Sequence, residues 1–206
     1  MATRVTRSER KARTRQDLLL AARAVFLRRG FHGASLDEIA EEAGYTKGAV
    51  YSNFAGKDDL YLALLDAHYD ARIAAYVELM LEEPTFEDAI AAVGRFMATA
   101  DERDPDWLPT LAEFVSHAAR EEMLRQAYVR VRERFLEAIA GVITALVERH
   151  GYALRIPALE AARASSVLAR GYSAERRLDP EAVSPEIFAE INAALMRGLT
   201  IPKGED

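Results

Sequence analysis

The 206-residue sequence contains no cysteine, which excludes a disulfide framework and thiolate chemistry and fits a reducing compartment. It has no run of 18 apolar residues, and its first residues, MATRVTRSERKARTRQD, lack the apolar core of a signal peptide. We therefore expect neither secretion nor membrane spanning, and we predict a cytoplasmic location.

Recognisable catalytic motifs are also missing. The sequence has no glycine-rich phosphate loop followed by Lys and Ser/Thr, and no nucleophile elbow, so we predict that the protein is not an enzyme. Its four histidines lie far apart, and only Glu113 and His117 have a spacing of four residues that could place two ligands on one helix face. This pair is weak evidence for a metal site, and we predict no metal and no cofactor.

Basic residues are scarce except at one end of the chain. The net charge is −6, yet residues 1–33 hold nine Lys/Arg against two Asp/Glu, which leaves the remainder with 18 basic and 31 acidic side chains. An acidic body repels polyanions and a basic N-terminal arm attracts them, so a nucleic-acid contact belongs at this end. The alternative is a disordered basic tail that only aids solubility.

The sequence also lacks alternating β patterns, internal repeats and low-complexity tracts, and helical periodicity predicts an all-α protein. Beyond the N-terminal helices, the predicted helical segments are 58–82, 85–102, 107–120, 121–149, 157–177 and 185–200. The 121–149 segment would be roughly 40 Å long, which is typical of a helix that spans a bundle.

Three shorter helices are predicted before residue 60. Thr14 with Asp17 resembles a capping box for the first, which Gly30 ends; its apolar face contains Leu18, Ala22 and Phe26. The second helix begins with a capping box of Ser35 and Glu38, buries Leu36, Ile39 and Ala40, and ends at Gly44. Thr46 can cap the third helix, in which Val50 and Phe54 face inward. Two short helices separated by a glycine turn, with a third ahead of them, predict a helix-turn-helix.

The third helix has the residues that a DNA-reading helix needs. Gly48 removes a side chain that would keep the backbone away from a sugar-phosphate chain, and Thr46 with the helix N-terminal amides can bind a phosphate. We also considered structural roles, in which the Tyr51 ring packs on the first helix and Lys57 is a solvated charge. Because Lys57 precedes two aspartates at a helix start, where a cation is disfavoured, we expect a phosphate partner instead. The candidate DNA-contacting residues are Ser35, Tyr45, Thr46, Lys47, Gly48, Tyr51, Asn53 and Lys57.

The stretch from Gly30 to Leu60, GFHGASLDEIAEEAGYTKGAVYSNFAGKDDL, resembles the tetracycline-repressor (TetR) family of bacterial transcription regulators. The resemblance is specific but covers only the first part of the chain. It implies DNA contacts, mostly to the backbone, at the positions of Thr46, Lys47, Gly48, Tyr51 and Lys57. It also implies a helical second domain in which a small molecule alters DNA affinity.

Three positions depart from the family pattern. Ala34 stands where members often have a threonine that meets a phosphate, Asn53 stands where a histidine is frequent, and Ser52 is small where larger side chains are common. One phosphate contact is therefore expected to be absent, and the base preference is expected to differ.

Aromatic residues recur at helical spacing in the second half. Such a stripe is often ordinary core, but polar tips such as those of Tyr69 and Trp107 suit a mainly apolar pocket with few orienting groups. We predict a small, mainly apolar ligand contacted by Tyr69, Phe96, Trp107, Leu111, Phe114, His117 and Tyr128.

The last two helices favour self-association. Segment 157–177 contains the small-residue run AARASSVLA, and the final helix has an apolar face. Two such helices from each subunit would form a four-helix interface, although they could instead cover their own subunit's core. The predicted homodimer interface contains Ser165, Leu168, Phe188, Ile191 and Leu195.

We therefore predict an all-α protein with a three-helix helix-turn-helix DNA-binding domain (1–60, with a basic arm) and a helical ligand-binding and dimerisation domain (61–206). As a homodimer it would bind a palindromic operator in double-stranded DNA, as a repressor rather than an activator, and a small-molecule ligand would release it. The alternatives are an all-helical ligand-binding or metal-binding enzyme and a sequence-independent DNA-binding protein.

Overall fold

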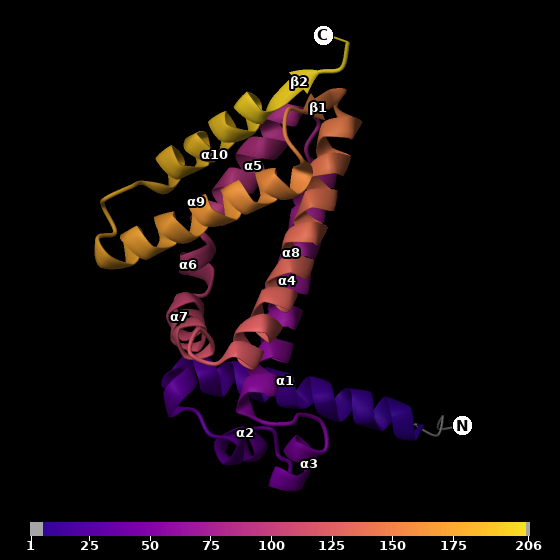
Figure 1. The fold of residues 1–206 in the computed structure, drawn as a ribbon, viewed down its shortest axis with the longest axis vertical. Coiled ribbons are helices and arrows are strands. Elements are labelled where there is room, and N and C mark those ends of the chain that lie inside the picture. Colours follow the sequence, from indigo (N-terminus) through magenta and orange to yellow (C-terminus); the bar gives the residue numbers. More distant parts are fainter. Residues whose placement is uncertain (1–5, 205–206) are drawn as a thin grey trace. The chain divides into compact units, whose positions relative to one another are not determined.

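The computed structural model describes residues 6–204. Figure 1 shows a chain built almost wholly of helices, as predicted. Its elements, in chain order, are α1 (Arg7–Gly33), α2 (Leu36–Glu42), α3 (Lys47–Tyr51), α4 (Lys57–Glu82), α5 (Phe86–Ala98), α6 (Ala100–Arg103), α7 (Trp107–Ala118), α8 (Glu122–Arg149), β1 (Tyr152–Leu154), α9 (Ala158–Leu178), α10 (Pro185–Leu199) and β2 (Thr200–Pro202). Among residues 6–204, no helix is long and apolar enough to cross a membrane.

The chain forms two compact units, and each unit combines two segments that are separate in the sequence. Unit 1 contains the chain up to His68 together with Asp106–Val131, and unit 2 contains Tyr69–Pro105 with the chain from Arg132 onward. Helices α4 and α8 therefore contribute residues to both. The predicted functional boundary at residue 60 stays a prediction.

Unit 1 is built around α1. The first helix begins at Arg7, because Thr6 and Glu9 form a complete capping box: the Thr6 side chain accepts from Glu9 N, and Glu9 accepts from Thr6 N. The predicted start at Thr14 is therefore wrong, and Thr14 lies inside the helix. Gly30 interrupts the helix as predicted, with φ 72°, a left-handed conformation that glycine adopts without a Cβ clash.

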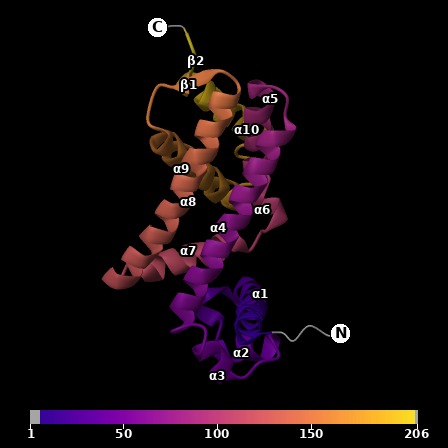
Figure 2. The ribbon, with the colours of Figure 1, turned by 90° about the vertical axis from the view of Figure 1, so that its right-hand side faces the viewer.

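The core of unit 1 is a cluster of aromatic rings from three helices. Phe26 and Phe31 of α1 pack on Tyr61 of α4 with ring centroids 5.0 and 5.3 Å apart, and Phe114 of α7 stacks on Tyr61 at 4.5 Å. All four side chains are buried. Since burial of a large aromatic side chain stabilises a fold by about 1.5–3 kcal/mol, α7 is a structural part of the unit that carries α2 and α3 (Figure 2).

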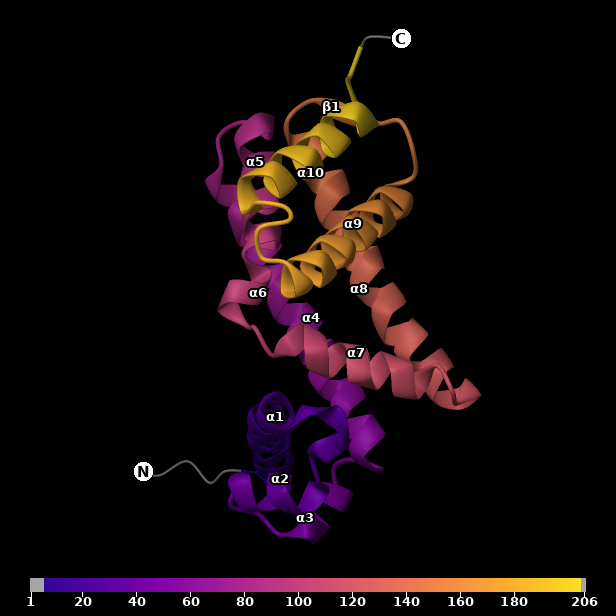
Figure 3. The same ribbon diagram turned by 90° about the vertical axis from the view of Figure 1, so that its left-hand side faces the viewer.

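Unit 2 combines parts of α4 and α8 with α5, α9 and α10. One of its apolar clusters includes Met80, Phe86, Ile90, Leu136, Val147 and Met196. Helices α5 and α10 lie side by side, with α9 next to α10 (Figure 3). A short antiparallel pairing of β1 with β2, in which Ala153 faces Ile201, was not predicted, because three-residue strands leave no alternation to detect.

Gly94 sets how closely α5 and α10 approach. A Cβ at this position would lie 2.8 Å from the carbonyl oxygen of Ala189 and 3.0 Å from its Cα. Backbone atoms cannot rotate out of the way as a flexible side chain can. The two helices therefore require glycine here for a packing reason.

We predict that Gly94→Ala destabilises the protein by about 1–3 kcal/mol, because the added methyl group overpacks the α5–α10 contact. Gly141→Ala in α8 is the matched control: its Cβ would meet nothing within 4 Å, and alanine should stabilise the helix by up to about 1 kcal/mol. Urea denaturation of both variants tests this. Equal stabilities would show that the close contact does not limit unit 2.

Candidate nucleic-acid interface

Helix α3 is short and its start is fixed by its own sequence. The Thr46 side chain accepts a hydrogen bond from Ala49 N at 3.3 Å, and Val50 and Phe54 are buried beneath the helix. Ser35 caps α2 in the same way by accepting from Glu38 N at 3.1 Å. These two predicted caps and the predicted inner face are confirmed.

The outer surface of α3 is open. Tyr51 is 54% exposed, and a Cβ added to Gly48 would have only the Thr46 hydroxyl oxygen nearby, at 3.7 Å. Gly48 therefore has no packing or backbone reason to be glycine. The absence of a side chain matters only to something that approaches from outside, such as a DNA backbone.

Lys47 lies at the same surface. Its ammonium pairs with Asp37 of α2 at 2.8 Å, and this hydrogen bond raises the pKa of Lys47. Both side chains are more than half exposed, so the pair contributes little to stability. Lys47 can therefore exchange Asp37 for a phosphate at small cost.

Two of the other candidates have partners inside unit 1. The Tyr45 hydroxyl donates to Asp17 at 2.9 Å. The Asn53 amide donates to the Ala49 carbonyl at 2.8 Å, and its buried Oδ1 has no hydrogen-bond partner among the described residues. In this state Asn53 closes the end of α3, and its predicted role in DNA contact stays a prediction.

Lys57 has a structural role, which the sequence analysis considered less natural than a phosphate contact. Its ammonium donates to the carbonyl oxygens of Phe31, His32 and Ala34 at 3.0, 3.4 and 3.2 Å, and it lies 4.7 Å from the centroid of the Phe31 ring. The sequence analysis favoured a phosphate partner over a structural role, and the structure shows that a structural role exists, because these carbonyls at the end of α1 compensate for the unfavourable helix start. Its phosphate contact stays a prediction.

Helix α7 holds the same segment from another side. The Glu113 carboxylate accepts from His32 N at 3.1 Å, and one of its oxygens would lie 2.6 Å from a Cβ at Gly30. One turn later, His117 lies 3.3 Å from Asp58 of α4. The Glu113–His117 spacing thus serves packing against the end of α1. No group of three possible metal ligands occurs among the described residues.

Two contacts of the interface were missed from the sequence. Arg15 of α1 donates to the Asn53 carbonyl at 2.9 Å and lies 4.3 Å from the Phe54 ring centroid, so it joins α1 to the end of α3. The contact of Glu113 with His32 crosses 81 residues. A local sequence pattern cannot predict contacts between residues that lie 38 and 81 positions apart.

The predicted ligand residues fall into two groups. Trp107, Leu111, Phe114, His117 and Tyr128 belong to unit 1, where all but the half-buried His117 are buried. The four buried side chains pack as ordinary core residues, which is the alternative that the sequence analysis left open for them. Tyr69 and Phe96 belong to unit 2, where Tyr69 stacks on Phe135 at 4.2 Å and Phe96 meets Tyr76 at 5.3 Å.

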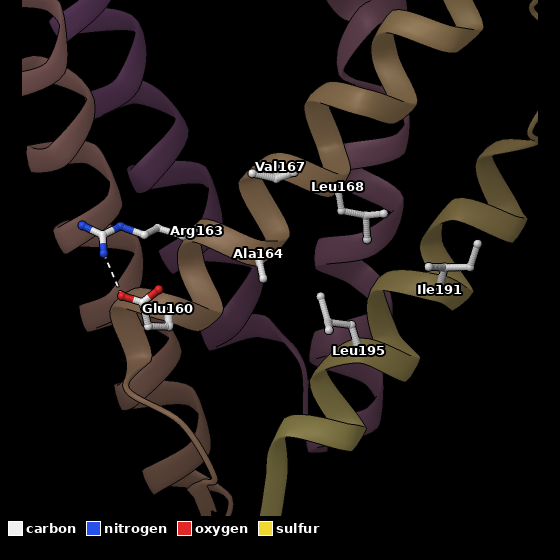
Figure 4. Close-up of a pocket in the computed structure, with 7 residues that line it drawn as sticks. All are labelled: Glu160, Arg163, Ala164, Val167, Leu168, Ile191 and Leu195. Atoms are coloured by element: carbon white, nitrogen blue, oxygen red, sulfur yellow. Dashed lines mark hydrogen bonds and ion pairs between the residues drawn. The ribbon is translucent and has the colours of Figure 1, made fainter.

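Three of the five predicted dimer residues line a groove of about 600 Å³ between α9 and α10 (Figure 4). Leu168, Ile191 and Leu195 line it, and Ser165 is half-buried on the same helix as Leu168. Phe188 is 1% exposed and stacks on Tyr172 at 4.1 Å. Its assignment to a subunit interface is corrected: Phe188 is core of its own unit.

The arrangement as a whole defines a class of protein. A capped, exposed recognition helix follows a short helix and a glycine turn, and the two short helices bury the apolar side chains of Ile39 and Val50 in the unit built around α1. This is the architecture of a helix-turn-helix DNA-binding unit.

Comparison with known proteins agrees with this class. Residues 18–64 match the family model for bacterial regulatory proteins of the tetR family. The transcriptional activator FasR of Mycolicibacterium smegmatis is 46% identical over 67 residues, which cover 32% of this chain and 29% of FasR. The transcriptional repressor AcnR of Corynebacterium diphtheriae is 31% identical over 115 residues, 56% of this chain and 55% of AcnR.

These matches cover well under two thirds of each relative, whereas the similarity to solved structures extends further. A putative TetR-family regulator from Mesorhizobium loti superposes with a TM-score of 0.70 at 24% identity, covering 92% of this chain and 96% of that one. At this identity the superposition shows the fold. The family match itself covers residues 18–64, and over the rest of the chain the similarity is one of fold.

We predict that Lys57→Met destabilises unit 1 by about 1–3 kcal/mol, because three carbonyls lose a charged donor. Lys47→Met removes the same charge from an exposed pair and should change stability by less than about 1 kcal/mol. Chemical denaturation of the two variants separates these roles. If Lys57→Met is as stable as Lys47→Met, the contact to the end of α1 is not a structural one.

Proposed function

We propose that the protein is a ligand-responsive transcriptional repressor that binds a palindromic DNA operator as a homodimer. The observation that carries this proposal is the exposed start of α3. A side chain at Gly48 would point into open space, and Thr46, Lys47 and Tyr51 lie next to it on the same short helix. As a regulator that binds DNA, the protein would act in the cytoplasm. The names of its relatives include both an activator and a repressor, and the direction of control is part of the proposal.

Binding to DNA is tested by a substitution that the fold tolerates. Gly48→Ala adds a methyl group to the outer surface of α3, where no described atom other than the Thr46 hydroxyl oxygen would meet it. We predict unchanged thermal stability and at least tenfold weaker binding to a duplex that the wild-type protein enriches from a random-sequence library. Ala49→Gly is the control, because it changes the neighbouring position of α3 without adding a side chain to the helix surface.

Two results would count against this part of the proposal. Wild-type affinity in Gly48→Ala would mean that the backbone of α3 does not approach DNA closely. Failure to enrich any sequence, with binding that depends on salt alone, would favour the sequence-independent alternative.

The dimer is proposed from the surface of α9 and α10. Val167 and Ile191 are 59% and 46% exposed, although both line the groove that also contains Leu168 and Leu195. Apolar side chains gathered on one helical pair are typical of an interface rather than of a free surface. A second copy would bring the same two helices and bury both faces in a four-helix arrangement.

We predict that Val167→Glu with Ile191→Glu converts the dimer into a monomer, because each carboxylate would be desolvated at the interface. The exposed positions leave the fold of unit 2 intact, which circular dichroism can verify. Sedimentation velocity at micromolar concentration decides the question. A wild-type monomer, or a dimeric double variant, would contradict the proposed interface.

Ligand binding is proposed for unit 2. Arg72 lies 5.7 and 5.8 Å from the ring centroids of Tyr76 and Phe96, and it donates to the Tyr76 hydroxyl at 2.8 Å. Together with the stacked Tyr69 and Phe135, this half-buried aromatic group with a cation favours a mainly apolar ligand with an anionic or polar end.

Helix α4 can transmit binding along its own backbone. It contains Tyr69, Arg72 and Tyr76, and it begins at Lys57, which holds the end of α1. To change a nearly saturated operator into a nearly empty one, ligands must favour the non-binding state by roughly 5.5 kcal/mol in total across the dimer. By linkage, operator DNA must then weaken ligand binding by the same free energy.

We predict that compounds found by thermal shift will release operator DNA, and that Phe96→Ala will weaken both effects together. Trp107→Ala is the control: Trp107 is 5% exposed and stacks on His68 within unit 1. Its loss should lower the melting temperature without weakening ligand binding. Ligands that bind the free and operator-bound protein equally would exclude this control mechanism.

A further inference from the structure

Helix α3 is too short to hold its own orientation. It has five residues, Lys47–Tyr51, whereas isolated helices of fewer than about 12–15 residues are marginal in water. Of its side chains only that of Val50 is buried. The angle at which α3 meets another molecule must therefore depend on contacts at its two ends.

The chain before α3 is attached to α1 by a hydrogen bond between side chains. The Tyr45 hydroxyl donates to Oδ2 of Asp17 at 2.9 Å, and both side chains are half-buried. The Tyr45 backbone is fixed as well, because its N–H donates to the Ala40 carbonyl of α2 at 2.9 Å. Tyr45 thus connects the segment between α2 and α3 to both earlier helices.

The chain after α3 is attached to the same turn of α1. Arg15 donates to the Asn53 carbonyl at 2.9 Å and lies 4.3 Å from the centroid of the Phe54 ring. This turn of α1 is itself anchored, because Leu18 is completely buried. Since Arg15 and Asp17 belong to one turn of α1, that turn holds the chain at both ends of the recognition helix.

Asp17 is a residue that attraction to DNA alone would not favour. It places a carboxylate in the unit that is proposed to approach phosphates, and a negative charge there repels them. A hydrogen bond to an ionised acceptor is shorter and stronger than one between neutral groups. The bond from Tyr45 therefore gives this carboxylate a use that offsets the repulsion, because it holds the Tyr45 ring in one place.

We infer that Asp17 is a specificity-determining positioning residue, which fixes the orientation of α3 through the Tyr45 hydroxyl. This role rests on the proposed function, since it matters only if α3 reads DNA. The alternative is that the hydroxyl leaves Asp17 for a DNA phosphate, because Tyr45 is among the residues predicted to contact DNA. The roles differ in sign: a positioning carboxylate favours the selected sequence and disfavours DNA in general.

The test separates the charge of Asp17 from its hydrogen bond. Asp17→Asn removes the charge but keeps an oxygen that can accept from Tyr45. Asp17→Ala removes both, and Tyr45→Phe removes only the hydroxyl. The probes are a duplex that the wild-type protein enriches from a random-sequence library and a scrambled duplex of the same length and composition. The ratio of the two affinities measures discrimination, and thermal denaturation checks that each variant is folded at the temperature of the assay.

We expect Asp17→Ala to bind the scrambled duplex more tightly than the wild-type protein does, because a charge that repels phosphates is gone. Its discrimination should fall on the order of tenfold, which is the size of effect expected for the loss of a hydrogen bond to a charged group. Tyr45→Phe should lose discrimination to a similar extent. Asp17→Asn should keep most of the discrimination, although it also binds the scrambled duplex more tightly.

The double variant Asp17→Ala with Tyr45→Phe shows whether the two side chains act together. If they act through their mutual hydrogen bond, the double variant should discriminate no worse than either single variant. If the hydroxyl contacts a phosphate instead, Tyr45→Phe should weaken binding to both duplexes, and its loss should multiply with that of Asp17→Ala.

Two results would overturn the inference. One is wild-type discrimination in Asp17→Ala or in Tyr45→Phe, and the other is a pair of losses that multiply in the double variant. Failure of the proposed function looks different, because the wild-type protein would then enrich no duplex at all.

Discussion

The geometry of the recognition helix depends on how the end of α1, after its break at Gly30, is held. The chain breaks at Gly30 and completes the end of α1 before Ser35 caps α2. Two groups of opposite charge fix the backbone of residues 31–34: the Lys57 ammonium binds three carbonyls, and the Glu113 carboxylate accepts from the His32 N–H. A turn with unsatisfied backbone groups would cost free energy and allow several orientations. Because Ser35 caps α2 directly after this turn, the two charged groups determine where α2 and α3 point.

The sequence predicted those features that arise from neighbouring residues. The caps at Ser35 and Thr46 are confirmed because a capping side chain bonds a backbone amide three residues away, and the inner positions of Val50 and Phe54 follow from helical periodicity. The predicted start of α1 was wrong because the sequence offers two capping patterns, Thr14 with Asp17 and Thr6 with Glu9, and only the second forms a complete capping box. The roles of Lys57 and Glu113 were not predictable, since their partners lie 23–26 and 81 residues away.

The same limit explains the division of the aromatic residues. Helical spacing showed that Trp107, Leu111 and Phe114 share a face, but not which surface this face would cover. In the structure they are buried in the core that also contains Tyr61 of α4. These residues therefore support the DNA-binding unit, and their role in ligand binding stays a prediction. Periodicity identifies a buried face, whereas its partner depends on contacts far apart in the chain.

The lysines near α3 show how one unit can be both rigid and able to bind. Lys47 forms an exposed pair with Asp37, and an exposed pair costs little to break because water solvates both charges. Lys57 bonds three carbonyls in a half-buried site, where loss of the cation would leave polar groups unsatisfied. A phosphate can therefore replace Asp37 as the partner of Lys47. It would compete poorly with the three carbonyls for the hydrogen bonds that the Lys57 ammonium donates. In this structure Lys47 is the transferable cation, and Lys57 holds the turn on which the position of Lys47 depends.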